Sequence, residues 1–412
     1  MKDSGIAWIG QIPEEWEIMR LKHLYNFEKG KNAAIYTQDY IGQHFGIYPV
    51  YSGQTENEGI MGRVDSFDYD IKECLFTTTV GAKVMTPSVL SGKFNLSQNC
   101  LIMLPKTTIN NRFIFYTLFP LFAYKKAMIP NYMQPSLRIE DLKTYSLYIP
   151  IFDEQTRIAD FLDKKCIAID SVLEKTKASI EEYKKLKQSI ITRAVTKGIQ
   201  LNRPMKDSGN KWFGEIPSAW ETKKIKFVFT IKKDIAGKEG YTVLSITQKG
   251  IIPKDLSKNE GQLAENYSNY QIVNIGDFAM NHMDLLTGGV DISKYYGVTS
   301  PDYRVFILND KQTNSDRYYL YLMRMCYSNK IFYGLGAGVS GMGRWRLQAD
   351  KFLNFIIPIP PTAEQQAIAD YLDKKCTEID NIISKKEKLL TELEAYKKSL
   401  IYEYVTGKKE VE

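Results

Sequence analysis

Two stretches of this chain occur twice, and they follow the same order in both halves. Residues 1–16 read MKDSGIAWIGQIPEEW, and residues 205–220 read MKDSGNKWFGEIPSAW. Residues 154–170 read EQTRIADFLDKKCIAID, and residues 364–380 read EQQAIADYLDKKCTEID. Because a duplicated sequence folds into duplicated structural units, the chain is expected to form two similar halves. Such an arrangement indicates a protein that reads two similar things at once.

Length and composition indicate a globular protein of more than one domain. With 412 residues, of which 44% are hydrophobic and 25% charged, two or three domains are expected. No apolar run approaches about 18 residues, and the N-terminus lacks the apolar core of a signal peptide, so we expect a cytoplasmic protein. The five cysteines form no CxxC pair and are interpreted as small buried residues. The three histidines lack metal-ligand spacing, so we expect no metal site.

Each half is predicted to contain a short segment rich in Trp and Pro, a globular region and a long helix. Short β-rich runs such as 75–80, 101–104, 241–244 and 305–308, separated by Gly, Asn and Asp turns, predict globular regions of mixed α/β (α+β) class. An aromatic helix-like run occurs in each, at 112–116 and 317–321. The predicted boundaries are 1–19, 20–150 and 151–198 in the first half, and 199–223 (a linker and the second Trp/Pro segment), 224–360 and 361–412 in the second.

The two long helices are the clearest local prediction. Neither contains Gly or Pro until Gly198 in the first half and Gly407 in the second, which gives about 43 residues and about 65 Å each. Asp153 is expected to cap the first helix. Thr362 is expected to cap the second, with Gln365 completing a capping box.

A heptad repeat of mainly apolar residues runs along both helices and predicts that they pair. Two long amphipathic helices in one chain most simply pack as an antiparallel coiled coil, which would give the two halves a pseudo-two-fold relation. Leu186, Leu389 and Tyr396 lie off this heptad line, either partly exposed without a role or available to further helices. The apolar residues of the predicted helix–helix seam are Ile169, Leu173, Ile180, Tyr183, Ile190, Ile379, Ile383, Leu390, Leu393 and Leu400.

The excess positive charge lies outside the helices. The net charge is +7, and the two helical segments taken together contain equal numbers of basic and acidic residues, so the remaining segments carry all of the excess. The globular regions are therefore the better candidates for contact with a polyanion. The sequence lacks a GxxxxGK[ST] phosphate loop and a [DN]-P-P-[FY] run, and shows no nucleophile–histidine arrangement.

Two short patterns resemble known motifs but lack their context. The GxGxxG at Gly336, Gly338 and Gly341 is not followed by the helix and acidic residue of a dinucleotide fold, so we interpret it as a loop that a ligand, such as DNA, can approach. Asp70-Ile71-Lys72 matches the tail of a nuclease pattern but lacks the upstream Pro-Asp, and we interpret it as a surface turn.

The repeated motifs resemble one family. The pattern W-x-G-x-I-P-x-x-W at 8–16 and 212–220, followed by Ile-Pro…Glu-Gln…Ile-Ala-Asp…Leu-Asp at 149–163 and 359–373, is similar to the specificity (S) subunits of type I restriction-modification enzymes. The likeness covers the whole chain, since both motifs occur twice and in order. We interpret Trp8, Trp16, Trp212 and Trp220 as core residues that hold each segment against the helix layer.

The resemblance implies a division of labour. Two target recognition domains would each read one half of a split DNA sequence, and two antiparallel helices would set their separation. The subunit would have no catalytic activity and bind no cofactor. It would recruit two methyltransferase (M) subunits that use S-adenosylmethionine, and through them ATP- and Mg-dependent restriction and translocase (R) subunits.

Under this interpretation each globular region approaches a major groove, where all four base pairs can be distinguished. Half-sites read from one face lie about one helical turn, or ~34 Å, apart. Lys and Arg would hold phosphates, while polar side chains would read base edges. The candidate DNA-contacting residues, chosen from polar clusters beside turns, are Ser52, Gln54, Thr78, Lys83, Gln98, Asn99 and Gln134 in the first region and Thr247, Gln248, Lys249, Asn281, His282, Arg344 and Arg346 in the second.

Two other classes of protein are weighed against this interpretation. A coiled-coil adaptor that binds only proteins would account for the helices, but its binding would not weaken steeply with salt as DNA binding does. A self-sufficient nuclease or methylase is disfavoured by the missing motifs.

Overall fold

The computed structural model describes residues 1–6, 9–53, 57–81, 84–130, 132–255, 266–286, 288–338 and 345–411. The chain divides into two compact units. Unit 1 contains residues 1–177 and 387–412, and unit 2 contains residues 178–386. Both long helices contribute to both units, so each unit holds one globular region and a pair of helical segments.

The globular part of unit 1 is built on a six-stranded sheet with the order β4-β9-β7-β8-β5-β6. Its neighbouring strands are antiparallel except for the parallel pair β5 and β8. Two further antiparallel pairs, β1 with β2 and β3 with β10, join distant segments of the chain. The strands are β1 (Lys2–Asp3), β2 (Gln11–Ile12), β3 (Glu17–Arg20), β4 (Tyr25–Lys29), β5 (Phe45–Tyr51), β6 (Ile60–Val64), β7 (Tyr69–Thr78), β8 (Pro87–Leu96), β9 (Cys100–Pro105) and β10 (Ser146–Ile149).

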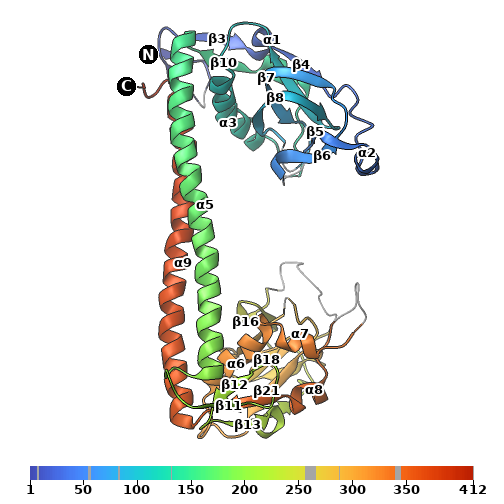
Figure 1. Cartoon of the computed structure of the whole chain (residues 1–412), viewed down its shortest axis with the longest axis vertical. Helices are drawn as coiled ribbons and strands as arrows, with labels where there is room; N and C mark the ends of the chain where they lie inside the picture. Colours follow the sequence, from blue (N-terminus) through green and yellow to red (C-terminus); the bar gives the residue numbers. More distant parts are fainter. Residues whose placement is uncertain are drawn as a thin grey trace. The chain divides into compact units, whose positions relative to one another are not determined.

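Helix α3 (Asn111–Ala127) covers this sheet and contacts β7 and β8 (Figure 1). Its aromatic residues enter the main core, where Phe113 packs edge-to-face against Trp16 with ring centroids 6.1 Å apart. The Asn110 side chain caps the helix by accepting from the backbone N–H groups of Arg112 and Phe113. The shorter helices of unit 1 are α1 (Leu21–Leu24), α2 (Gln38–Gln43), η1 (Asn57–Gly59) and α4 (Ile139–Thr144).

The globular part of unit 2 uses a smaller central sheet of four antiparallel strands, β14-β21-β18-β19. Among the described residues of this unit there are also four two-stranded sheets: β11 with β12, β13 with β22, β15 with β16, and β17 with β20. The strands are β11 (Met205–Asp207), β12 (Glu215–Pro217), β13 (Glu221–Lys224), β14 (Phe229–Lys232), β15 (Leu244–Thr247), β16 (Gly250–Pro253), β17 (Gln271–Val273), β18 (Phe278–Met280), β19 (Val290–Ile292), β20 (Gly297–Thr299), β21 (Arg304–Leu308) and β22 (Ile356–Ile359).

Helix α6 (Asp316–Ser328) occupies in unit 2 the place that α3 occupies in unit 1, as the repeated aromatic run predicts. Phe229, Phe278 and Phe306 form an aromatic core in which ring centroids lie 5.1 to 5.3 Å apart. Phe278 stacks on Phe306, and Phe229 meets both rings edge-to-face. The remaining helices of this unit are η2 (Ile225–Phe227), α7 (Ile331–Leu335) and α8 (Ala349–Asn354). The mixed α/β class predicted for both globular regions is confirmed.

The long helices are α5 (Phe152–Lys197) and α9 (Thr362–Val405), and in each unit their segments pack side by side in opposite directions (Figure 1). Gly198 and Gly407 follow them with φ of +74° and +68°, the left-handed conformation in which glycine commonly ends a helix. All ten residues of the predicted seam are buried or half-buried.

Three lysines interrupt the apolar seam. Lys386 lies with its Nζ 5.7 Å from the centre of the Tyr183 ring, and Lys187 and Lys397 are paired with aspartates across the seam. In unit 2, Lys187 Nζ contacts the two carboxylate oxygens of Asp380 at 2.7 and 2.6 Å. In unit 1, Lys397 Nζ contacts those of Asp170 at 2.6 and 2.7 Å. The two pairs are repeat equivalents, because Lys397 and Asp380 correspond to Lys187 and Asp170. A charged residue tolerated in a coiled-coil seam favours one register over others.

Four local predictions were wrong. Ile151 and Pro361, rather than Asp153 and Thr362, accept the first helical hydrogen bonds of α5 and α9, so the expected caps lie inside the helices. The Thr362 hydroxyl instead donates to the Thr313 carbonyl of the neighbouring globular region. The Asp70–Lys72 segment belongs to strand β7 rather than to a turn, because it pairs with β8. Of the predicted strand 241–244, only Leu244 lies in a strand.

The Trp/Pro segments are held against the long helices. Trp16 and Trp220 are buried, and their indole N–H groups donate to Glu154 on α5 and Glu364 on α9 at 3.3 and 2.8 Å. This confirms the core role predicted for both residues. Trp212 is partly buried against the core of unit 2, and Trp8 lies outside the described residues. The five cysteines are buried and free, and no helix of the described chain is long and apolar enough to cross a membrane.

Candidate nucleic-acid interface

The structure brings the candidate residues of the first globular region together at one place on the sheet. Thr79 donates its backbone N–H to Asn99 at 2.8 Å, and Leu137 donates to Thr79 at 2.8 Å. A short bridge also joins Val80 to Ser136. A Cβ added at Gly53 would lie 3.7 Å from the Val80 carbonyl oxygen. Four loops thus converge, and we call Ser52, Gln98, Asn99 and Gln134 the first polar cluster.

The first polar cluster faces solvent. Gln98, Asn99 and Gln134 are exposed, and Ser52 is half-buried. Asn99 has φ of +63°, which places its side chain on a tight turn between β8 and β9. The prediction that Thr78 lies at this surface was wrong, since the residue is only 3% exposed. Gln54 and Lys83 lie outside the described residues.

The candidates of the second globular region also converge. Asn281 donates its backbone N–H to Gly289 at 2.9 Å, and a Cβ added at Gly289 would clash with the Thr247 carbonyl at 2.5 Å. The backbone N–H of Leu347 donates to His282 at 3.0 Å. Three loops therefore meet, and Thr247, Gln248, Lys249, Asn281, His282 and Arg346 form the second polar cluster. Arg344 lies outside the described residues.

The members of the second polar cluster differ in what they offer a ligand. Gln248, Lys249 and Arg346 are exposed, while Asn281 and His282 are half-buried. The Thr247 hydroxyl closes the turn by donating to the Gly250 carbonyl at 3.0 Å and accepting from Lys249 N–H at 3.1 Å. The Asn281 side-chain oxygen accepts from two backbone N–H groups at 3.2 Å. The exposed side chains of this cluster therefore project from loops that Thr247 and Asn281 hold in place with their own hydrogen bonds.

His282 does not supply a positive charge to this cluster. Burial, together with the charges of Arg304 and Arg346, lowers the pKa of His282 to about 3. The imidazole is therefore neutral at pH 7, so it could accept or donate a hydrogen bond but would not attract a phosphate by charge.

Sequence reasoning missed Arg304, which holds the second polar cluster in place. Its guanidinium is 5% exposed, lies 4.8 Å from the centre of the Phe352 ring, and donates to the Leu347 carbonyl at 2.8 Å. Burial lowers the pKa of Arg304 to about 10, so the group stays charged at pH 7. The sequence gives no signal of this role, because an arginine in a short β-rich run is ordinarily expected to be exposed at the surface of the sheet.

The two polar clusters occupy equivalent positions in their units. In unit 1, Thr78 at the end of β7 pairs with Cys100 on β9, and in unit 2, Met280 at the end of β18 pairs with Arg304 on β21. Just beyond these strand ends, the Thr79 carbonyl accepts from Leu137 N–H, and the His282 carbonyl accepts from Leu347 N–H. Leu137 and Leu347 precede α4 and α8. The duplication thus places one exposed polar cluster in each unit.

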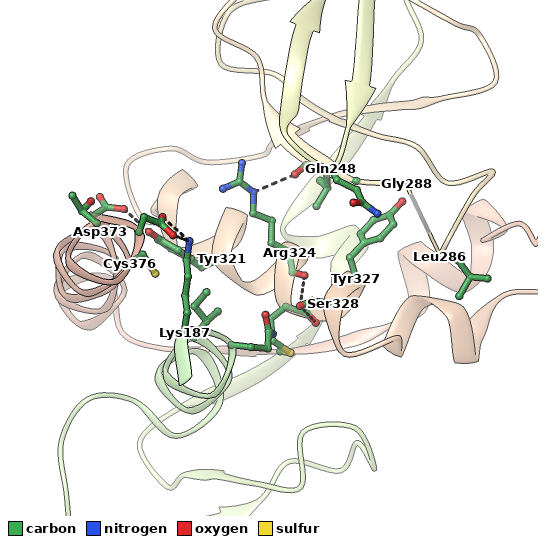
Figure 2. Close-up of a pocket in the computed structure, with 17 residues that line it drawn as sticks. Lys187, Gln248, Leu286, Gly288, Tyr321, Arg324, Tyr327, Ser328, Asp373 and Cys376 are labelled. Carbon is green, nitrogen blue, oxygen red and sulfur yellow. Dashed lines mark hydrogen bonds and ion pairs between the residues drawn. The ribbon is translucent and has the colours of Figure 1, made fainter. Parts of the chain in front are cut away.

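A cavity of about 530 Å³ lies beside the second polar cluster, between the loops and the long helices. Figure 2 shows Gln248 and Arg324 on one side of it and Lys187 and Asp373 on the other. Arg324 pairs with Asp291 at 2.7 Å, and Lys187 pairs with Asp380. Because both cations already have carboxylate partners, we assign no phosphate to this cavity.

Unit 1 has a cavity of about 570 Å³ at the equivalent place. Lys397 and Asp170 line it, as their counterparts line the cavity of unit 2. The wall contributed by the globular region differs, since Phe119, Pro120 and Ala123 stand where unit 2 has Arg324, Met325 and Ser328. The cavity of unit 1 is thus apolar where that of unit 2 is polar.

The comparisons with known proteins place this geometry in a family. The sequence profile described as the type I restriction modification DNA specificity domain matches residues 13–182 and 217–395. Each matched range runs from a Trp/Pro segment through a globular region into a long helix. The chain therefore belongs to the type I restriction-modification DNA specificity family and is a specificity subunit with two copies of that domain.

Relatives and solved structures agree with this assignment. The specificity subunit of the type I restriction enzyme MjaVIII of Methanocaldococcus jannaschii is 24% identical over 418 residues, which cover 97% of this chain and 94% of the relative. The MpnII specificity subunit of Mycoplasma pneumoniae is 31% identical over 177 residues, or 41% of this chain and 50% of the relative.

Two solved structures share the fold. A chain from a study of complex assembly and conformational transition of the type I R-M system covers 97% of this chain and 100% of its own length with a TM-score of 0.70. The HsdS subunit from Thermoanaerobacter tengcongensis covers 99% and 100% with a TM-score of 0.50. Both are 12% identical to this chain, so they show the fold alone.

Proposed function

We propose that this subunit reads a bipartite DNA target, with one half-site contacted by each polar cluster. The observation that carries the proposal is the pair of exposed polar clusters at equivalent positions of two duplicated units. Amide and guanidinium side chains such as Gln98, Gln248 and Arg346 are suited to base edges in the major groove. Lys249 and neighbouring basic residues are suited to phosphates, which position a protein without specifying sequence.

The loops around each cluster differ between the units, which supports two different half-sites. Unit 1 presents amide and hydroxyl groups from a six-stranded sheet, whereas unit 2 adds Lys249 and Arg346 from a four-stranded one. A good bidentate side-chain contact discriminates against the wrong base by about 1–3 kcal/mol. Two unlike clusters would therefore specify two unlike short sequences.

The subunit itself would be non-catalytic. Among the residues that the structure describes, no group of three or more His, Cys, Asp and Glu residues is placed to hold a metal ion. S-adenosylmethionine, ATP and Mg would belong to two methyltransferase subunits and to the restriction and translocase subunits that they bring.

The long helices would recruit the methyltransferase subunits. Leu186 on α5 and Leu389 and Tyr396 on α9 are 48%, 40% and 55% exposed, although the same helices bury their seam residues. Exposed apolar side chains on an otherwise charged helix are suited to pack against a helix of a partner. Because the units are duplicated, two copies of one partner would fit the two units.

The experiment that tests the function is to express the chain with its cognate methyltransferase subunit and map modified bases across the host genome. We expect a motif with two specified parts separated by an unspecified spacer. Gln134→Ala should relax only the part read by unit 1, and Gln248→Ala only the other part, so each variant controls for the other. A continuous motif, or modification that does not depend on this chain, would contradict the proposal.

A further inference from the structure

One joint between globular region and long helix is repeated almost atom for atom in the two units. In each unit an arginine in the first turn of the region's main helix reaches two aspartates on a long helix. A tyrosine one turn further along the same helix binds one of those aspartates. We call these residues the hinge clamp: Arg112, Tyr116, Asp160 and Asp163 in unit 1, and Arg317, Tyr321, Asp370 and Asp373 in unit 2.

In unit 1 the clamp joins α3 to α5. Arg112 Nη2 donates to Asp160 Oδ1 at 2.7 Å, and Nη1 donates to Asp163 Oδ2 at 2.5 Å. The Tyr116 hydroxyl donates to the other oxygen of Asp163 at 2.7 Å. Partial burial opposes the charge on Arg112, but its hydrogen bonds to the two aspartates outweigh this and raise the arginine pKa. The Arg112 guanidinium therefore keeps its positive charge over the physiological pH range.

In unit 2 the clamp joins α6 to α9 in the same way. Arg317 Nη2 donates to Asp370 Oδ1 at 2.5 Å, and Nη1 donates to Asp373 Oδ2. The Tyr321 hydroxyl donates to Asp373 Oδ1 at 2.8 Å, and both side chains can be seen in Figure 2. Every atom pair of the first clamp thus has its counterpart in the second.

A buried glutamine supports each clamp. Gln155, which is 3% exposed, accepts from the Asn110 backbone N–H at 2.9 Å and donates to the Pro150 carbonyl at 2.8 Å. Gln365, which is 1% exposed, bonds Ser315 and Pro360 in the same manner, at 2.9 Å each. The first turn of α3 or α6 is therefore attached to the long helix in two places, at its N-terminus through the glutamine and on its side through the arginine.

The conservation of this joint between the halves contrasts with the divergence of the regions that it holds. The sheets differ in strand number and order, the cavities beside α3 and α6 differ in polarity, and the two polar clusters share no residue pattern. A contact that is the same in both units, while their polar clusters differ, is expected to have a role that both units share. Both units need a defined angle between the globular region and the helix that carries it.

The outer ion pairs of the clamps are too exposed to contribute much to folding. Arg112 is 39% exposed and Asp160 is 60% exposed, and the corresponding residues of unit 2 are 40% and 60% exposed. Ion pairs of this exposure contribute little to stability, because water screens the charges. A guanidinium that donates to two separate carboxylates, together with a tyrosine on one of them, nevertheless fixes direction better than a single contact does. The effect of the clamp should therefore appear in geometry rather than in folding.

We propose that the hinge clamps set the angle at which each recognition domain projects from its long helix, and that they thereby determine which spacer lengths between the two DNA half-sites are accepted. Arg112 and Arg317 are positioning residues that do not touch DNA. This inference rests on the proposed reading of a bipartite target. A recognition domain free to tilt would reach half-sites displaced by a base pair in either direction.

The test is a census of spacer lengths among modified genomic sites, made with the full chain and its cognate methyltransferase subunits. Wild type should modify sites with one spacer length. In Arg112→Gln and Arg317→Gln the two half-site sequences should be unchanged, but preference for the native spacer over its neighbours should fall about fivefold, which corresponds to about 1 kcal/mol. Arg112→Lys should recover only part of the preference, because an ammonium cannot bridge two carboxylates as a guanidinium does.

Lys177→Gln is the matched control, because Lys177 forms an ion pair of 3.1 Å with Glu174 inside α5 and spans no joint. Tyr116→Phe removes one hydroxyl from the clamp. If Arg112→Gln fails to fold, this variant takes its place in the spacer census and should show the same loss of preference for the native spacer. An unchanged spacer distribution in a folded clamp variant would overturn the inference, as would altered half-site bases with a fixed spacer. A continuous motif in the wild type would instead overturn the bipartite function itself.

Discussion

The paired lysines of the helix seam predict the behaviour of half of the protein. Lys187 and Asp170 both lie on α5, and their repeat equivalents on α9 are Lys397 and Asp380. Because Lys187 pairs with Asp380 and Lys397 with Asp170, two copies of α5 packed antiparallel would pair Lys187 of each copy with Asp170 of the other. Residues 1–204 should therefore form a symmetric dimer that keeps both ion pairs and the apolar seam.

The size of the effect follows from the exposure of these pairs. The lysines are 29% and 28% exposed, so each pair should contribute about 1 kcal/mol to association. Lys187→Ala removes two pairs from the dimer and should raise its dissociation constant about 30-fold, or by about 2 kcal/mol. Lys187→Asp should weaken it further by placing like charges together. Combining Lys187→Asp with Asp170→Lys restores opposite charges and should recover most of the affinity.

Sedimentation equilibrium over a range of protein concentrations measures these constants, and Lys177→Ala provides a surface control. If residues 1–204 stay monomeric, the helix pairing described here is wrong for the isolated half. If the charge-swapped double variant dimerises more weakly than either single variant, the lysines do not act through these aspartates.

Three further predictions test individual residues. His282 has a pKa of about 3 in the folded protein, below its ordinary value of about 6.5, so the unfolded chain takes up the proton first and stability falls as pH drops from about 6.5 towards 3. Urea unfolding should show that His282→Gln removes about 1–2 kcal/mol of the loss between pH 7 and 4.5, after allowance for partial exposure; an unchanged loss would place the acid sensitivity elsewhere. Gln155→Ala leaves a buried N–H and a buried carbonyl without their side-chain partner and should lower the free energy of unfolding by about 2–3 kcal/mol, whereas a loss under 0.5 kcal/mol would show that water replaces the amide. Arg346→Ala should weaken binding to the cognate duplex by about 1–3 kcal/mol while sparing unrelated DNA, and an equal loss on all duplexes in filter binding would mark a phosphate contact instead.

The sequence predicted the features that depend on local pattern or on the repeat. The bounds of α5 and α9 follow from an uninterrupted heptad pattern that ends at Gly198 and Gly407, and the buried Trp16 and Trp220 follow from their repeated context. The pairing of Lys187 and Lys397 could not be predicted, because their aspartate partners lie on the other helix and leave no local trace in the sequence.

Strand pairing and the joints were beyond sequence reasoning for a different physical reason. Strand β3 pairs with β10 and β13 pairs with β22 across most of a globular region, and such pairing depends on non-local packing rather than on local propensity. In the sequence, Gln155 and Gln365 resemble ordinary first-turn helix residues, and the pattern predicts a capping role for Gln365. Their side chains instead satisfy backbone groups of neighbouring segments, which only the folded chain reveals.

The most direct test of the central claim, that each unit reads its own half-site, is to exchange residues 20–150 for the matching region of a related specificity subunit. Modified sites mapped in cells that express the hybrid with the methyltransferase should change in one half of the motif and keep the other half and the spacer. A hybrid whose motif changes in both halves, or in neither, would show that the two units do not read DNA independently.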